Sequence, residues 1–283
     1  MPLNLDAIGR PLGPVVGPYN AEDVILYALA VGCGFDHLDY CHEQYLKALP
    51  TFRAAHAMDF FLQVVEKVAA DRNGIVHAGH RMHFHAPIPL TGETRTTGYI
   101  ARIHDKGPGT GALIEAHFDI HDGNARHLAS GTVAIFARND GGFGGTSSPA
   151  ALFEFPPRPP DAIVAAQPQA AQPLLYRLTG DRFALHADPE FARRAGFKGP
   201  VMHGLCTLGF ATVALIDTFL SGQPQRLSLL AGRFVHPLYP GVPISTQLWQ
   251  ISPDRALWRT VDTASGALVI DRGEAQWREG TER

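Results

Sequence analysis

An internal repeat constrains the fold of this chain more than any other feature of its sequence. The run FHAPIPLTG at 84–92 resembles FVHPLYPG at 234–241, and YAL at 27–29 resembles YRL at 176–178. Both matches have a spacing of about 150 residues and keep the same order. After the first run in each half, three segments alternate as β-strands do: 95–103, 112–120 and 127–137, then 244–251, 256–261 and 267–277. Helix-bearing segments followed by consecutive strands, present twice, predict an α+β fold made of two copies.

A proline-rich segment separates the two copies. Seven prolines fall between 149 and 173. Because proline fixes φ and has no amide donor, this segment cannot be a helix interior or a central strand. We predict an extended linker at 149–173 that joins an N-terminal copy, 1–148, to a C-terminal copy, 174–283. The run DGGFGG at 140–145, just before the linker, is typical of a flexible loop.

Composition excludes several classes of protein. The 24 basic and 27 acidic residues lack the basic surplus of nucleic-acid-binding proteins. No apolar run approaches the roughly 20 residues that span a membrane, and the first residues do not resemble a signal peptide. Three scattered cysteines are too few for a disulfide scaffold or a zinc site. We therefore expect a cytoplasmic protein with no nucleic-acid or membrane partner.

Helix signals occur in both halves. Asn20 can cap a helix over 21–32, and apolar residues recur at helical spacing over 52–70. In the second half, Asp188-Pro189 is a helix start signal. A longer apolar helix is predicted from about 203 to 220, and its composition indicates burial inside a wrapping sheet.

The residues with the clearest chemistry lie just before that long helix. Asp181 and His186 are five positions apart in a predicted turn, so both side chains can face one space. A carboxylate and an imidazole beside one water can share proton transfer near neutral pH. Gly204 follows at the predicted helix start, where free amides can stabilise an oxyanion. Together they predict a site for proton transfer next to a carbonyl group.

Each of these residues also has a purely structural interpretation. Asp181 and Asp188 can be turn or cap residues, and His186 can be a hydrogen-bonded buried histidine. His203 can help to close the helix start, and Gly204 can allow close packing. Only the combination favours chemistry.

The combination resembles a known family. The pattern G-D-x-x-x-L-H-x-D-P at 180–189, AGF at 195–197 and P-V-x-H-G-L-C-T at 200–207 is similar to that of the MaoC-like, type 2 enoyl-CoA hydratases. The first half resembles the non-catalytic copy of the two-copy members in LPTF at 49–52, HAPIP at 85–89 and GGFGG at 141–145. The resemblance covers nearly the whole chain.

The resemblance implies a double hot-dog fold, in which each copy wraps an antiparallel sheet around a long helix. It implies (R)-specific hydration of a trans-2-enoyl-CoA to the 3-hydroxyacyl-CoA, or the reverse dehydration, with no metal and no redox cofactor. By motif position, Asp181 and His186 would be the acid–base pair, which of them is the acid being left open. The Gly204 amide would bind the thioester oxygen, His203 and Phe183 would belong with it to the oxyanion and substrate-binding residues, and the first copy would provide an acyl-chain cavity.

One part of the pattern departs from the family. The family usually has Asn-Pro where this chain has Phe183-Ala184. Phenylalanine has no hydrogen-bonding side-chain group, so we expect Phe183 to form an aromatic wall of the substrate pocket. The hypothesis is a bulky or branched acyl-CoA substrate; slower hydration and loss of hydration remain alternatives.

The first copy lacks the pair. In the gap-free alignment of the two halves, Gly32 stands opposite Asp181 and His37 opposite His186, which predicts one active site per chain. Two other functions stay open: a hot-dog acyl-CoA thioesterase, and a non-catalytic acyl-CoA-binding or partner subunit.

Some properties have only weak signals in the sequence. Lys198, Arg182 and Arg233 are candidates to bind the phosphates of CoA. Four histidines between 77 and 85 show no recognised metal-ligand spacing. A further homodimer is compatible with the double hot-dog fold.

Overall fold

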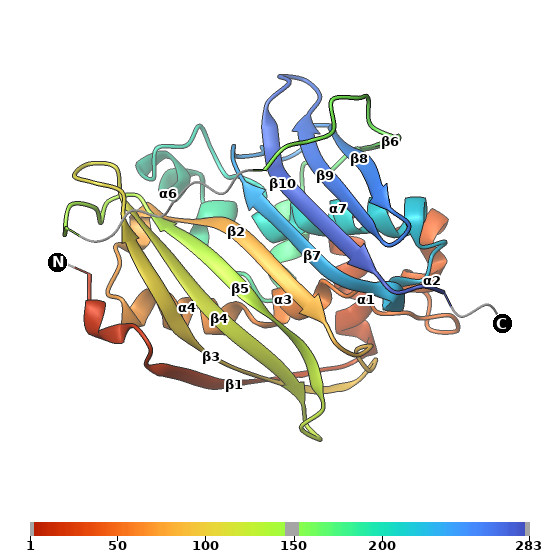
Figure 1. Ribbon diagram of the computed structural model, residues 1–283, viewed down its shortest axis with the longest axis horizontal. Coiled ribbons are helices and arrows are strands. Elements are labelled where there is room, and N and C mark those ends of the chain that lie inside the picture. Colours follow the sequence, from red (N-terminus) through yellow and green to blue (C-terminus); the bar gives the residue numbers. More distant parts are fainter. Residues whose placement is uncertain (1–2, 145–152, 281–283) are drawn as a thin grey trace.

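One ten-stranded antiparallel sheet dominates the computed structural model, which describes residues 3–144 and 153–280 (Figure 1). The strand order is β1-β3-β4-β5-β2-β7-β10-β9-β8-β6. From each edge of the sheet toward the middle, equivalent strands of the two copies follow the same order, as the repeat predicts. This order is β1-β3-β4-β5-β2 in the first copy and β6-β8-β9-β10-β7 in the second. The strands are β1 Pro11–Tyr19, β2 Ile75–Phe84, β3 Gly92–Asp105, β4 Ala112–Asp122, β5 His127–Ala137, β6 Ala162–Ala166, β7 Leu227–Phe234, β8 Ile244–Ser252, β9 Arg255–Asp262 and β10 Leu268–Trp277.

The two copies join along β2 and β7. These strands pair antiparallel, from Gly79 opposite Arg233 to His83 opposite Leu229. They are equivalent strands of the repeat, since the repeated runs at 84–92 and 234–241 both begin where these strands end. The joint therefore makes one continuous sheet from two half-sheets.

The main helices cover one face of this sheet (Figure 1). The longest helix, α7, is buried on all sides, since every residue from 205 to 216 is buried. This confirms the predicted core helix. Asn20 caps α1, as predicted, and the structure adds a capping box with Asp23. No helix in the described ranges is long and apolar enough to cross a membrane. The helices are α1 Ala21–Ala30, α2 Leu38–Cys41, α3 Phe52–His56, α4 Met58–Lys67, α5 Gln172–Tyr176, α6 Pro189–Arg194 and α7 Gly204–Phe219, with short 3₁₀ turns between some of them.

The single helix predicted over 52–70 is wrong. The chain forms α3 and α4 there, separated at Ala57, which has φ −94° and ψ 10°. On both sides of this point the amide bonds to the carbonyl three residues back: Ala57 to Ala54, and Phe60 to Ala57. Such tighter bonds break the regular α-helical ladder, so the segment forms two helices.

Part of the predicted linker belongs to the sheet. Residues 162–166 form β6, which pairs antiparallel with β8 at the edge of the second copy. The prolines flank this strand at 160 and 168, so they leave its ladder intact. The start of the linker, at 149–152, and Gly145 of the glycine-rich run lie outside the described residues.

Candidate active site

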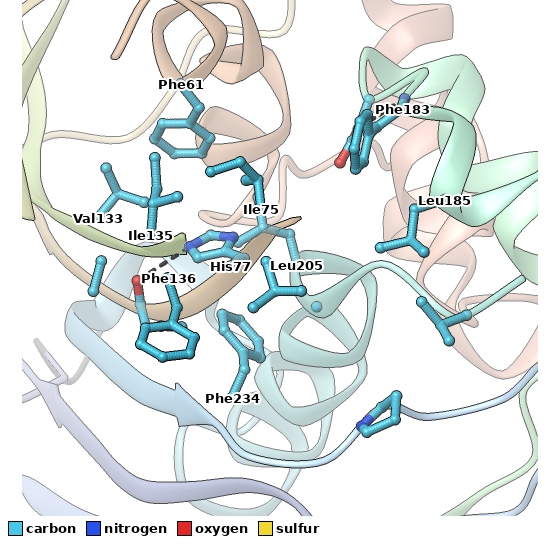
Figure 2. A pocket seen from close by; sticks show the side chains of 18 of the residues that line it. Phe61, Ile75, His77, Val133, Ile135, Phe136, Phe183, Leu185, Leu205 and Phe234 are labelled. Carbon is cyan, nitrogen blue, oxygen red and sulfur yellow. Dashed lines mark hydrogen bonds between the residues drawn. The ribbon is translucent and has the colours of Figure 1, made fainter. Parts of the chain in front are cut away.

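A cavity of about 1320 Å³ lies beside the joint between the copies (Figure 2). The first copy contributes residues of α4, β2 and β5, most of them apolar. The second copy contributes the turn 180–186 and the start of α7. The predicted residues Asp181, His186, Gly204 and Phe183 all line this cavity.

Local hydrogen bonds fix Asp181 at the cavity wall. It follows Gly180, whose positive φ of 137° reverses the chain after α5. The backbone amide of Phe183 donates to Asp181 Oδ1 at 3.1 Å, and His203 Nε2 donates to the Asp181 backbone carbonyl at 3.1 Å. Both the carboxylate and the main chain of Asp181 are therefore held in place.

His186 has one free ring nitrogen. Its Nδ1 donates to the backbone carbonyl of Val201 at 2.9 Å, which leaves Nε2 as the proton acceptor. Burial holds the pKa of His186 below its ordinary value, and the negative charge of Asp181 opposes this effect. The imidazole is therefore neutral and basic at Nε2 near pH 7.

His203 contacts both Asp181 and His186. Its ring stacks on the ring of His186, with centroids 3.7 Å apart, and its side chain is 1% exposed. Burial and the neighbouring His186 hold the pKa of His203 well below its ordinary value. The sequence predicted His203 among the substrate-binding residues, but it does not line the cavity, and its contacts are those of a group that positions Asp181 and His186.

Gly204 is the first residue of α7, whose opening amides have no intrahelical acceptor. A Cβ at this position would lie 3.0 Å from the ring of Phe234, tighter than normal packing. The absence of a side chain lets Phe234 close against the helix start.

Phe183 forms part of the wall, as its aromatic character predicts. Its ring lies 5.3 Å from that of Phe191 and 6.2 Å from that of His186, in both cases edge to face. It packs against the small core cluster around Leu185 and faces the cavity across from Phe61 (Figure 2).

The first copy has no equivalent pair. Gly32 has φ +92°, and a Cβ there would come within 2.1 Å of the Phe210 ring, so an aspartate cannot occupy this position without rearrangement. His37 bonds instead to Asp217 of α7 at 2.8 Å. These positions serve the contact between the copies.

Asp181, His186 and His203 each offer a potential metal-ligand atom, all within 4.8 Å of one another. The two imidazole rings of this group stack on each other. One nitrogen of each ring is also occupied by a backbone carbonyl. Across residues 3–144 and 153–280 this is the one such group, so the four histidines at 77–85 do not form another.

Cationic side chains surround the cavity. Of the three predicted candidates, Arg182 and Arg233 line it, whereas Lys198 does not. Four others were missed by the sequence, because separate loops and strands bring them together without a motif: Arg72, Lys106, Arg138 and Arg272. Such cations suit a polyanionic substrate group.

The fold and the site define a class. An antiparallel sheet wrapped on a helix layer, present twice in one chain, is a double hot-dog protein, and here one copy has a carboxylate–imidazole pair beside a helix start. Solved structures agree. A MaoC-like dehydratase from Phytophthora capsici has a TM-score of 0.85, with 29% identity over 98% of this chain and 100% of that one. A Mycobacterium tuberculosis protein described as having a double hotdog fold, 16% identical over 96% of both chains, has a TM-score of 0.62 and supports the fold alone.

Sequence comparisons identify the family. The second half, 153–271, matches the MaoC like domain, and 18–139 match the MFE-2 hydratase 2 N-terminal domain. The chain is 34% identical to 3-hydroxyacyl-thioester dehydratase Y of Mycobacterium tuberculosis, over 99% of this chain and 100% of that protein. It is 36% identical to enoyl-CoA hydratase ChsH3 of the same organism, over 95% and 97%. The chain belongs to the MaoC-like dehydratase family.

Proposed function

We propose that this protein adds water to a trans-2-enoyl-CoA to give the (R)-3-hydroxyacyl-CoA, or removes it in reverse. The observation that carries the proposal is the meeting of Asp181, His186 and the first amide of α7 in one cavity. Relatives named enoyl-CoA hydratase and 3-hydroxyacyl-thioester dehydratase support this chemistry.

The mechanism follows from charge development. The Gly204 amide polarises the thioester carbonyl, which makes C3 electrophilic and stabilises the enolate-like transition state. A water held between Asp181 and His186 attacks C3 and loses a proton to the pair, and a proton from the pair goes to C2. His186 Nε2 accepts from the water, since Nδ1 is committed to Val201. The net change is the addition of one water, which is redox-neutral, so the proposed reaction needs no redox cofactor.

The cavity is large enough for part of CoA together with a bulky acyl group. A volume of about 1320 Å³ exceeds the ~300–1,000 Å³ of ordinary ligand pockets. The first copy provides its apolar side, with Phe61, Ile135 and Phe136 (Figure 2). We place the acyl chain there and the CoA phosphates near Arg182 and Arg233.

The test is loss of the enoyl-thioester absorbance with short, long and ring-bearing trans-2-enoyl-CoAs, followed by chiral analysis of the product. Asp181→Asn and His186→Ala should each lower kcat/KM by about 10²–10⁴-fold, as expected for loss of an acid–base group.

Matched controls come from the same chain. Asp188 caps α6 and His37 pairs with Asp217, and neither lines the cavity. Asp188→Asn and His37→Ala should therefore keep wild-type kcat/KM. Release of free CoA would favour a thioesterase instead, and acyl-CoA binding without turnover would favour a partner subunit.

A further inference from the structure

We propose that His77 selects acyl chains that carry a hydroxyl group, by accepting a hydrogen bond from that hydroxyl inside the cavity. This inference rests on the proposed acyl-CoA function and extends it to a class of substrate.

A β-bulge turns His77 toward the helix-covered face of the sheet. In the pairing of β2 with β5, Ala78 is an extra residue between His77 and Gly79. An extra residue reverses the alternation of side chains along a strand, so His77 and His80 face the same side although they are three residues apart. Their rings are 5.4 Å apart, and both contact Phe61.

The surroundings of His77 in the cavity are apolar. Figure 2 shows its ring among Phe61, Ile75, Leu205 and Phe234. The ring centroids lie 5.6 Å from that of Phe61 and 4.8 Å from that of Phe234. A polar group in such a place is costly unless its polar atoms have partners.

One of its two nitrogens has such a partner. Nε2 donates to the backbone carbonyl of Gly79 at 3.1 Å, which fixes the tautomer and leaves a lone pair on Nδ1. No group in the described part of the chain bonds to Nδ1. Burial lowers the pKa of His77 to about 4, although the bond to Gly79 opposes this, so the ring stays neutral. Nδ1 is therefore an acceptor that needs a donor, which a hydroxyl supplies and an ether or alkyl group does not.

The position of His77 places this donor on the acyl chain rather than on CoA. The Phe234 ring is close to both His77 and Gly204: its centroid is 4.8 Å from that of His77, and it closes against Gly204. Phe61, which also contacts His77, belongs to the apolar side of the cavity where the proposed function places the acyl chain. A hydroxyl part-way along the acyl chain reaches Nδ1.

The experiment compares three acyl-CoAs of each chain length: unsubstituted, ω-hydroxy and ω-methoxy. Turnover of the trans-2-enoyl forms gives kcat/KM, and calorimetry with the saturated forms gives Kd without any need for catalysis. At the best length the hydroxyl form should be favoured about tenfold or more over both others. His77→Phe should remove this preference, and His77→Asn, whose amide oxygen can accept, should retain part of it.

Equal ratios in the wild type and in His77→Phe would overturn the inference. This failure is separable from failure of the proposed function. Turnover of unsubstituted enoyl-CoAs tests the hydratase alone, whereas the Kd ratio of saturated forms tests His77 even in an inactive protein. His77→Asn guards against a folding defect in His77→Phe.

Discussion

At the residue scale, the start of α7 has little room for any side chain at Gly204. The ring of Phe234 closes against Gly204, so Gly204→Ala must push the ring or the helix start by a few tenths of an ångström. Because the amide that we propose to polarise the thioester moves with the helix start, we expect kcat/KM to fall about tenfold or more. Steady-state kinetics of the variant measures this.

A second substitution distinguishes crowding from other causes. Phe234→Leu removes the ring that the new Cβ would meet, so the double variant Gly204→Ala/Phe234→Leu should recover part of the activity relative to Gly204→Ala. Wild-type activity in the single variant would refute the assigned role of Gly204.

Also at the residue scale, a substitution of Phe183 tests whether this side chain selects the shape of the acyl group. Phe183→Asn removes the wall that packs on Phe191 and returns the amide that the family usually has. We expect the ratio of kcat/KM for ring-bearing over straight-chain enoyl-CoAs to fall about tenfold. A difference of a methylene group in an apolar pocket changes such a ratio by about this factor. An unchanged ratio would show that Phe183 does not select the acyl group.

How far the sequence predicts the site depends on how local each contact is. Asp181, His186 and Gly204 were predicted because turn and helix-start signals lie close to them in the chain. The carbonyl of Val201, which sets the His186 tautomer, is 15 residues away from it, and the His203 ring reaches His186 only in the folded chain. His77 depends on a bulge that no composition signal marks.

At the scale of elements, strand alternation predicted six of the ten strands, whereas β1, β2, β6 and β7 were not predicted. The six predicted strand segments correspond to β3, β4, β5, β8, β9 and β10. The strand β6 was missed because prolines surround it, although its short run without proline can still pair at a sheet edge. The break between α3 and α4 was missed because apolar periodicity continues through it.

An ion-pair cluster ties the elements at the joint together. Glu274 of β10 accepts from Arg81 of β2 at 3.0 Å and from Arg255 of β9 at 3.0 Å. Burial raises the pKa of Glu274, but hydrogen bonds from Gln276 and Arg81, together with the charges of Arg81 and Arg255, lower it by more. Its folded pKa therefore lies below the unfolded value, so the cluster stabilises the fold above that value and is lost as the pH falls through the folded pKa.

Glu274→Gln should lower the free energy of unfolding by about 1–2 kcal/mol at neutral pH, since it leaves two partly buried arginines without their carboxylate. Denaturant unfolding measures the change. Glu93 in the exposed pair with Arg95 is the control: Glu93→Gln should change stability by less than about 0.5 kcal/mol. Equal effects of the two variants would contradict a special role of the joint.

At the scale of the whole molecule, the two copies contribute different parts of the candidate site. Gly32 and His37 stand where the second copy has Asp181 and His186, yet the first copy lines most of the apolar side of the cavity. The site is therefore complete only when the two half-sheets join along β2 and β7. A homodimer and a cytoplasmic location stay predictions.

The whole molecule also buries an unusual set of imidazoles. Burial lowers the pKa values of His77, His80, His186 and His203. Below the ordinary histidine pKa, the unfolded chain binds protons that the folded protein excludes, so stability must fall as the pH falls. For His77, a folded pKa of about 4 against 6.5 corresponds to about 2 kcal/mol lost at pH 5.

Calorimetry at pH 7.5 and pH 5 should thus show a clear drop in Tm, reversible on return to neutral pH. Carboxylates with lowered pKa values, such as Asp262 and Glu274, titrate below this window and contribute little to the drop. His77→Phe should reduce the drop, because it removes one proton that only the unfolded chain can bind. A Tm that is constant across this range, or a drop of equal size in the variant, would mean that these imidazoles do accept protons in the folded protein.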